Sequence, residues 1–161
     1  MRNSNVLFLL VLAMASTATM AQNLAPNAPV DDPKGVSARG FEKIEKAVAP
    51  YVAQGKKTYP DAKKRFIAGL PGNQSFFVSV RLTDVRGLHE DVFVQVLHID
   101  PDTSEIMGRV ASHIDLVQGY TAGQKITLTE DRVRDWTIAH PDGTEEGNVV
   151  GKFLDTYRPE N

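Results

Sequence analysis

The sequence contains no cysteine among its 161 residues. Without thiols, the chain forms no disulfide and carries no acylated lipoprotein cysteine, and it has neither a cysteine nucleophile nor a cysteine-based zinc site. A surplus of positive charge is missing too, because the formal net charge is −2. Binding to a nucleic-acid backbone needs a basic surface that releases counterions, so we expect no nucleic-acid partner.

Compact catalytic signatures are also missing. No serine lies in a G-x-S-x-G elbow, and no glycine-rich run follows a strand and opens a helix as a phosphate cradle does. The histidines, none of them three or four residues from another, are His89, His98, His113 and His140. A metal site would have to assemble across strands, for example from His98 and His113 with Asp100 or Asp115. We prefer four separate histidines, and expect no metal and no cofactor.

Long apolar runs are confined to the N-terminus. Val6–Ala15 follows the cation Arg2, is too short for a comfortable membrane span, and leads into small residues that end at Ala21. This pattern predicts a secretory signal peptide at residues 1–21, cleaved after Ala21, and a bacterial periplasmic or secreted protein. No later stretch is apolar enough to span a bilayer. The proline-rich residues 22–36 predict a flexible tether.

Residues 37–161 predict a single domain that begins with helix. Apolar residues recur at steps of three and four between Phe41 and Val52, with charged residues on the other side. Pro50 predicts an interruption or an early end, because proline removes a helical hydrogen bond. A second helix is expected from Thr58, a residue that can cap an N-terminus. The sequence therefore predicts one or two N-terminal helices.

From Ser75 the apolar period changes to two, which is typical of strands. The expected strands are 75–83, 92–99, 105–112, 124–129 and 133–140. Gly108 predicts a bulge or a close backbone approach, and Val149–Tyr157 predicts a last strand or a short helix. Helices before consecutive strands indicate an α+β fold. We expect the helices to pack on a strongly bent, about five-stranded antiparallel sheet, a half-barrel-like meander.

The segment Gly123–Ile138 predicts a β-hairpin, because two alternating runs flank the charged break Glu130–Arg132. It holds the only tryptophan, Trp136, which is interpreted first as a core residue. Asp135 lies on the opposite strand face, so it is the residue of the pair that could meet solvent or a partner, and the pattern leaves its role open.

Five residues form the candidate binding site: Glu90, Arg109, His113, Asp135 and Trp136. The two acids lie beside bulky groups, and burial there raises a carboxyl pKa and suits a general acid. The alternative is structural, since such acids also accept backbone N–H bonds or pair with arginines. A half-exposed tryptophan is a natural anchor for a partner protein. No catalytic residue is identified.

The spacing of several motifs resembles the DUF2314 family of small bacterial proteins, which includes the YegJ-like proteins. The motifs are the acid-led strand Glu90–Val94, Gly108 leading into Val110 and Ser112, Gly123 opening a short strand, and the pair Asp135–Trp136. Phe93 and Ser112 depart from the family, where tryptophan and asparagine are more usual. The resemblance covers a core of about residues 59–157 and implies a bacterial origin without implying a reaction.

The leading hypothesis is a non-enzymatic periplasmic binding module that offers a sheet face or edge to a protein or peptide partner. The missing catalytic signatures and the size of the domain favour it. The alternative is a small enzyme or an enzyme-inhibitor site built on Glu90, Asp135, Arg109 and His113. That alternative requires the four side chains to converge in one pocket.

Overall fold

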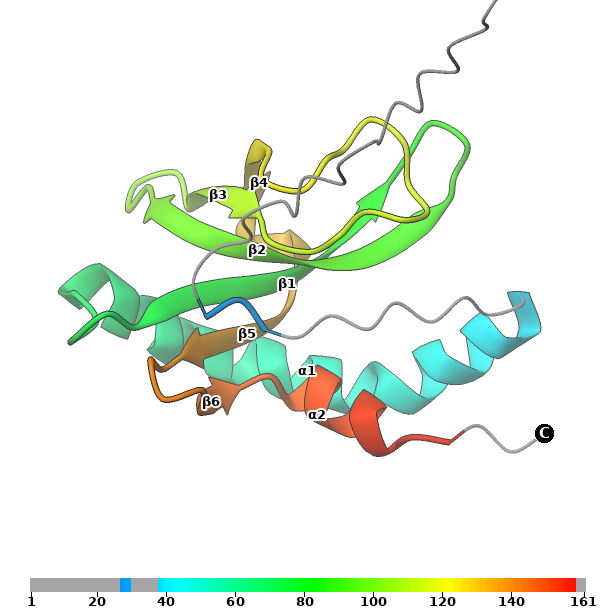
Figure 1. The fold of residues 1–161 in the computed structure, drawn as a ribbon, viewed down its shortest axis with the longest axis horizontal. Coiled ribbons are helices and arrows are strands. Elements are labelled where there is room, and N and C mark those ends of the chain that lie inside the picture. The colour runs from blue at the N-terminus through cyan, green and yellow to red at the C-terminus, as the bar shows by residue number, and fades with distance from the viewer. Residues whose placement is uncertain (1–26, 30–37, 159–161) are drawn as a thin grey trace, which may run out of the picture.

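The computed structural model of the protein describes residues 27–29 and 38–158 (Figure 1). The expected signal peptide lies outside the described residues, as does the expected tether apart from 27–29. In chain order the elements are α1 (Ala38–Ala68), β1 (Ser75–Thr83), β2 (His89–Ile99), β3 (Glu105–Val110), β4 (Lys125–Thr129), the 3₁₀ turn η1 (Glu130–Arg132), β5 (Val133–Ala139), β6 (Glu145–Gly147) and α2 (Val149–Thr156).

The strands form one open antiparallel sheet of six strands in the order β4-β3-β2-β1-β5-β6. The α+β class and the packing of helices on an antiparallel sheet are confirmed. The short strand β6 had no predicted counterpart, because its segment contains the turn-forming residues Gly147 and Asn148. The C-terminal segment forms the short helix rather than a strand. Figure 1 shows both helices running along the same side of the molecule.

The predicted hairpin of β4 and β5 is wrong, although both strands exist. β4 pairs with β3, whereas β5 pairs with β1 on the other side of the sheet. The strands β1 to β4 form the expected meander, and η1 carries the chain away from it. The physical reason lies in β5, where Thr137, Ile138 and Ala139 are all buried. A strand that is buried on both faces needs a paired strand on each edge and packed elements over its faces. A position beside β4, at the edge of the sheet, would not provide them.

α1 is one continuous helix, so the predicted interruption at Pro50 is wrong. Both prolines inside it, Pro50 and Pro60, are exposed. The carbonyl groups that lose their hydrogen-bond donors belong to Lys46 and Lys56, which are exposed as well and lie where water reaches the helix. Packing against the sheet and against α2 then holds the helix together across both positions.

α1 passes close against β5 at Gly55. A Cβ atom at this position would lie 2.7 Å from Asp135 Oδ1 and 2.9 Å from the Arg134 carbonyl oxygen. Carbon atoms do not approach oxygen so closely without displacement, so only glycine lets the helix lie directly against the strand. One turn later, the Trp136 indole N–H donates to Thr58 Oγ1 at 2.8 Å.

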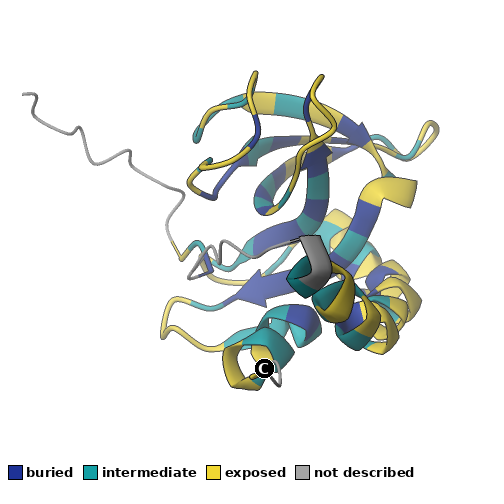
Figure 2. Cartoon of the chain, turned by 90° about the vertical axis from the view of Figure 1, so that its right-hand side faces the viewer, coloured by how far each residue is buried: buried dark blue, intermediate teal, exposed yellow. Residues whose placement is uncertain are grey.

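Two faces of the sheet are distinguished by what covers them. The inner face carries Phe76 and Val78, and Tyr59 and Phe66 of α1 stack on Phe76 with ring centroids 6.4 and 5.3 Å apart. The outer face carries Phe77, which belongs to a separate, smaller apolar cluster. Figure 2 shows buried residues along the strands and exposed residues on the outward side of the helices and in the loops.

Two smaller clusters complete the core. The outer-face cluster consists of Phe77, Ala111 and Ala139, with Ala28 and Phe93 packed against it. α2 is held against α1 by aromatic stacking between Phe153 and Tyr51, whose ring centroids are 4.3 Å apart. The described part of the N-terminal segment and the C-terminal helix therefore both contribute to packing.

Candidate functional site

Glu90 is a structural acid. Its Oε1 accepts the backbone N–H of Asp115 at 2.9 Å, and its Oε2 accepts those of Leu116 and Val117 at 2.9 and 3.1 Å. A carboxylate that receives three backbone donors holds a loop in place. The structural alternative predicted for this residue is confirmed, and both of its oxygens are engaged.

Asp84 fixes the same loop from the turn between β1 and β2. Its oxygens accept the backbone N–H groups of Arg86, Leu88 and Gln118. Burial opposes its ionisation, but the hydrogen bonds from the Arg86 guanidinium and these backbone groups hold the pKa of Asp84 at about 2. Sequence reasoning assigned Asp84 only to a turn, because the loop that it binds lies more than thirty residues away.

Asp135 is buried, with 2% of its surface exposed, which decides the open question of its exposure against contact with solvent. Its Oδ1 accepts the backbone N–H of Trp136 and its Oδ2 that of Val150, both at 2.8 Å. Val150 belongs to the first turn of α2, where N–H groups have no partner within the helix. Burial raises the pKa of Asp135, and the backbone hydrogen bonds partly offset that effect. The carboxylate therefore anchors α2 to β5.

Among the described residues, no hydrogen bond joins the side chain of Trp136 or His113 to the side chain of Glu90 or Asp135. Trp136 is partly buried against the inner-face core, which confirms its interpretation as a core residue. Its indole N–H donates a hydrogen bond to the hydroxyl of Thr58. His113 is exposed in the loop between β3 and β4.

The five candidate residues are not brought together as one site. Among the residues that the structure describes, no hydrogen bond or ion pair joins the side chains of any two of them. On β2, Glu90 pairs with Leu82 of β1, whereas Arg109 lies opposite Gln95, five positions further along. Five residues of extended strand span about 17 Å. Glu90 and Arg109 therefore cannot act on one small group.

A network of ion pairs that sequence reasoning missed joins α1 to the sheet. Arg81 binds Glu45 of α1 and Asp91 of β2, each through two nitrogen atoms. Arg134 also reaches Glu45, at 3.2 Å. The hydrogen bond from Arg81 is the largest cause that lowers the pKa of Glu45. Because the ion pairs link elements that are distant in sequence, we interpret this network as one that holds α1 on the sheet.

Arg109 is different, because it has no such partner. It lies on the outer face of β3, directly opposite Lys125 of β4 and Gln95 of β2. Neither Arg109 nor Lys125 forms an ion pair or a side-chain hydrogen bond with any described residue. The nearest acid along β3 is Glu105, four residues or about 13 Å away. Two like charges directly opposite each other destabilise a sheet by about 0.2–1 kcal/mol.

Exposed apolar side chains lie beside this pair of cations. Met107, two residues before Arg109 on the same face, is 46% exposed, and Leu97 of β2 is 42% exposed. Val96 and Ile99 both point into the core, so the bulge between them places Leu97 and His98 together on the outer face.

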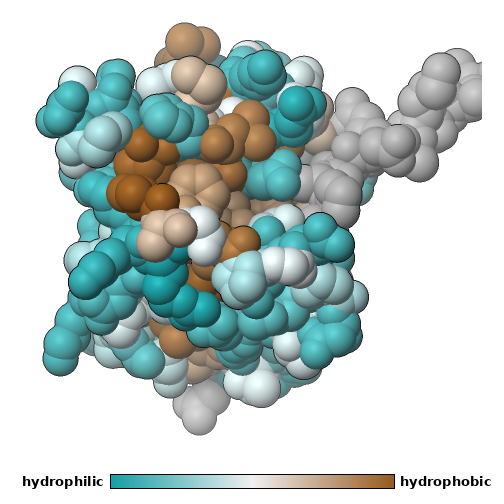
Figure 3. All heavy atoms as spheres, turned by 90° about the vertical axis from the view of Figure 1, so that its left-hand side faces the viewer, coloured by the Kyte–Doolittle hydropathy of each residue, from teal (hydrophilic) through white to brown (hydrophobic). Residues whose placement is uncertain are grey.

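We call these five outer-face residues the outer-face patch: Leu97, His98, Met107, Arg109 and Lys125. Figure 3, viewed from the end where α1 finishes, shows brown hydrophobic residues gathered in the middle of this face of the molecule, with teal hydrophilic residues around them.

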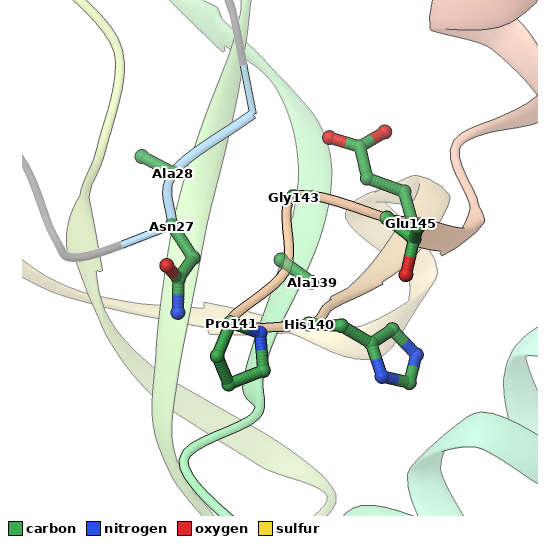
Figure 4. Close-up of a pocket in the computed structure, with 8 residues that line it drawn as sticks. Asn27, Ala28, Ala139, His140, Pro141, Gly143 and Glu145 are labelled. Atoms are coloured by element: carbon green, nitrogen blue, oxygen red, sulfur yellow. The ribbon is translucent and has the colours of Figure 1, made fainter.

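A small cavity of about 210 Å³ lies between the N-terminal segment and the turn after β5. Figure 4 shows Asn27 and Ala28 on one side of it, with the imidazole of His140 pointing away from them. That imidazole lies 3.0 Å from Glu146, which also binds Arg65. The hydrogen bond from Arg65 holds the pKa of Glu146 at about 2. Of the residues that line the cavity, His140 and Glu145 are the titratable ones, and the His140 imidazole is engaged with Glu146, so the cavity offers no convergent set of reactive groups.

Within residues 27–29 and 38–158, no group of three or more His, Asp or Glu side chains is placed to hold a metal ion. Over the same residues, neither helix combines the length and the apolar character that a membrane crossing requires.

Comparisons with known proteins place the chain in a family. No curated protein matches it, and no solved structure matches it. A family model described as an uncharacterized protein conserved in bacteria, DUF2314, matches residues 42–159, well over half of the chain. The match begins earlier than the resemblance seen in the sequence and takes in most of α1. The chain belongs to the DUF2314 family.

Proposed function

We propose that the protein is a secreted, periplasmic binding module that holds a protein or peptide partner through the outer-face patch. The observation that carries this proposal is the pair of cations Arg109 and Lys125, which lie directly opposite each other and have no side-chain partner among the described residues. The domain gains no stability from their juxtaposition. An anionic partner would gain two charge-assisted contacts there.

The surroundings of the cations support binding rather than catalysis. Met107 and Leu97 add exposed apolar area next to the charges, and aromatic, methionine and arginine side chains are enriched in protein interfaces. The acids that an enzyme would need are already occupied, since Glu90 holds a loop and Asp135 anchors α2. No described cavity collects acid, base and cation together.

Export forms the second part of the proposal, and it rests on the pattern of residues 1–21. The test is to express the full chain in a Gram-negative bacterium and to sequence the N-terminus of the product. We expect the protein in the periplasmic fraction with Gln22 as its first residue. A chain lacking residues 2–21 should stay in the cytoplasm. Recovery of the full chain, uncleaved, from the cytoplasm would refute export.

Binding is tested by charge reversal within the patch. The protein and its Arg109→Glu and Lys125→Glu variants are immobilised and exposed to periplasmic extract, and bound proteins are quantified by mass spectrometry. The matched control is Lys64→Glu, because Lys64 is an exposed cation of α1 without an ion pair among the described residues. We expect one partner to fall at least about tenfold with either patch variant and to be unchanged with the control.

A stability measurement separates a binding role from a structural one. Replacing Arg109 by Gln removes the repulsion, so the variant should unfold at the same urea concentration or a slightly higher one. If the Arg109 variants unfold markedly earlier, then the arginine supports the fold, and loss of a partner would not show binding. If every partner binds the patch variants and the control equally, the proposal is wrong.

A further inference from the structure

β4 is an edge strand of the sheet, so one of its two long edges is paired with β3 and the other is paired with no described strand. Backbone hydrogen bonds join the paired edge to β3. The Val110 N–H donates to the Gln124 carbonyl oxygen at 2.9 Å, which marks Val110 and Gln124 as a hydrogen-bonded pair. Such pairs alternate along an antiparallel ladder, so Ile126 and Leu128 also direct their backbone groups towards β3. The backbone N–H and C=O groups of Lys125 and Thr127 therefore point away from the sheet.

An open edge of this kind is a template for another strand, and many proteins protect theirs. In β4 the protection is slight: the strand is short, and Lys125 is its only charged residue. A charge on an edge strand rejects a strand that carries the same charge and admits one with the opposite charge. The side chains of Lys125 and Thr127 are exposed on the outer face, next to Arg109 and Met107 respectively.

We infer that β4 is the docking edge for an extended acidic peptide, which adds to the sheet as a further antiparallel strand. This inference rests on the proposed function and specifies how the partner is held. The peptide backbone bonds to the outward groups of Lys125 and Thr127. An acidic side chain of the peptide lies opposite Lys125 and relieves its repulsion from Arg109. The main-chain bonds supply affinity, and the alternating side chains supply specificity.

The apolar part of the patch sets the neighbouring position of the peptide. Thr127 lies opposite Met107, and Met107 lies opposite His98 beside Leu97. A peptide residue opposite Thr127 continues this row across the sheet. A flexible methionine adapts to different apolar side chains, so an apolar residue of variable shape fits there. The expected ligand therefore carries an acidic residue opposite Lys125 and an apolar residue two positions away, opposite Thr127 and on the same face.

A second copy of the chain is a poorer occupant of this edge. If two β4 strands paired antiparallel about Thr127, each Lys125 would face Thr129 of the other copy. Threonine supplies no negative charge, so the two opposed cations of each copy would remain unpaired. An acidic peptide is the occupant that satisfies both the backbone and the charge.

The test uses a blocked heptapeptide of threonine in which the second and sixth residues are Glu and the fourth is Val, so that Glu and Val share one face. The matched peptide has Lys in place of both Glu residues. Each is titrated into the full chain after signal removal, and amide hydrogen exchange is measured residue by residue by NMR. In the free protein, the amides of Ile126 and Leu128 are protected by β3, whereas those of Lys125 and Thr127 exchange fast. We expect the acidic peptide to slow exchange at Lys125 and Thr127 at least about tenfold, and the basic peptide to have no effect.

Charge reversal provides a second measurement that leaves the backbone intact. With Lys125→Glu, the affinity for the acidic peptide should fall at least about tenfold, and the affinity for the basic peptide should rise by a similar factor. Lys64→Glu should change neither. N-methylation of the alternate peptide amides that face β4 should abolish binding, because it removes the N–H donors that extend the ladder.

The outcomes are separable from those of the proposed function. If the acidic peptide binds and the Arg109→Glu variant loses it, but exchange at Lys125 and Thr127 is unchanged, the outer-face patch binds ligands and strand addition is wrong. If neither amide is protected at millimolar acidic peptide, strand addition is wrong as well. If both amides become protected without peptide as the protein concentration rises, the occupant is a second copy and the acidic peptide is refuted.

Discussion

Replacing Asp135 by Asn tests whether a buried carboxylate anchors the C-terminal helix. The carboxylate oxygens each accept one backbone N–H at 2.8 Å, from Trp136 and from Val150. Asparagine has the same shape but only one oxygen, and its NH₂ group would face one of these N–H donors. The substitution therefore removes one accepted hydrogen bond and the negative charge while it leaves the packing volume almost unchanged.

The expected cost follows from these contacts. A hydrogen bond to a charged group contributes about 1.5–3 kcal/mol, and a buried N–H left without a partner costs about 1–3 kcal/mol. Relief from burying a charge offsets part of the loss, because burial raises the pKa of Asp135. We expect the free energy of unfolding to fall by about 2 kcal/mol at neutral pH.

The measurement is urea unfolding followed by the fluorescence of Trp136, the only tryptophan and the neighbour of the substituted residue. With an m value of about 2 kcal/mol/M, the midpoint should fall by about 1 M. The matched control is Asp61→Asn, because Asp61 is an exposed acid of α1 with no hydrogen bond or ion pair among the described residues. It should leave the midpoint unchanged.

The pH dependence provides an independent check. Burial raises the pKa of Asp135 in the folded protein above 3.8, the ordinary value that it has in the unfolded chain. At a pH between the unfolded-state pKa and the folded-state pKa, the folded protein therefore holds a proton that the unfolded chain has lost. The contribution of this group to stability is therefore fully present below 3.8 and is lost as the pH rises through the folded pKa. The Asn variant lacks this slope. If the variant is as stable as the parent protein at neutral pH, with the same slope, Asp135 does not anchor α2.

Three further predictions concern contacts that hold the fold together. Glu90→Gln should speed amide exchange at 115–117 about tenfold or more without unfolding the sheet, as measured by NMR. Gly108→Ala should lower the unfolding free energy by about 2 kcal/mol in urea, because its Cβ would lie 2.7 Å from a backbone oxygen of β2; unchanged stability would contradict the close approach. Thr58→Val should cost about 1–2 kcal/mol by the same assay, since it leaves the indole N–H of Trp136 unpaired, whereas an equally stable variant would show that this bond contributes nothing.

Local patterns predicted most of the elements because they depend on neighbours in sequence. Alternation marked β1 from Ser75 to Thr83, and its residues do face the core in turn. Gly108 was recognised as a close approach for the same reason, since only a residue without a side chain fits between adjacent strands. Both features are set by the residues within or directly beside one strand.

Pairing could not be predicted in the same way. A break of three residues between β4 and β5 predicts a hairpin, yet three other strands separate β4 from β5 in the sheet. Their partners are chosen by burial that only the whole sheet provides. Pro50 likewise predicted a break in α1, because its exposure and the support of the sheet are tertiary properties that the sequence does not reveal.

The candidate site shows the same division. Asp135 and Glu90 were identified as noteworthy acids, but their donors come from α2 and from a distant loop, which the sequence does not reveal. Arg109 was identified, whereas Lys125 was missed. Their opposition depends on the register of β3 against β4, and a register shift of one residue would place them on different faces.

The order of strands has a consequence for how the chain folds. β1 lies in the middle of the sheet, and its second neighbour, β5, is made only after the meander of β2, β3 and β4 is complete. α1, the first helix of the chain, finds its partners in β5 and α2, at the opposite end of the sequence. Contacts so far apart make folding slow and non-local. A chain released before β5 would hold an exposed helix and a strand β1 that is paired along one edge only, so the sheet is completed only when the last quarter of the chain is present.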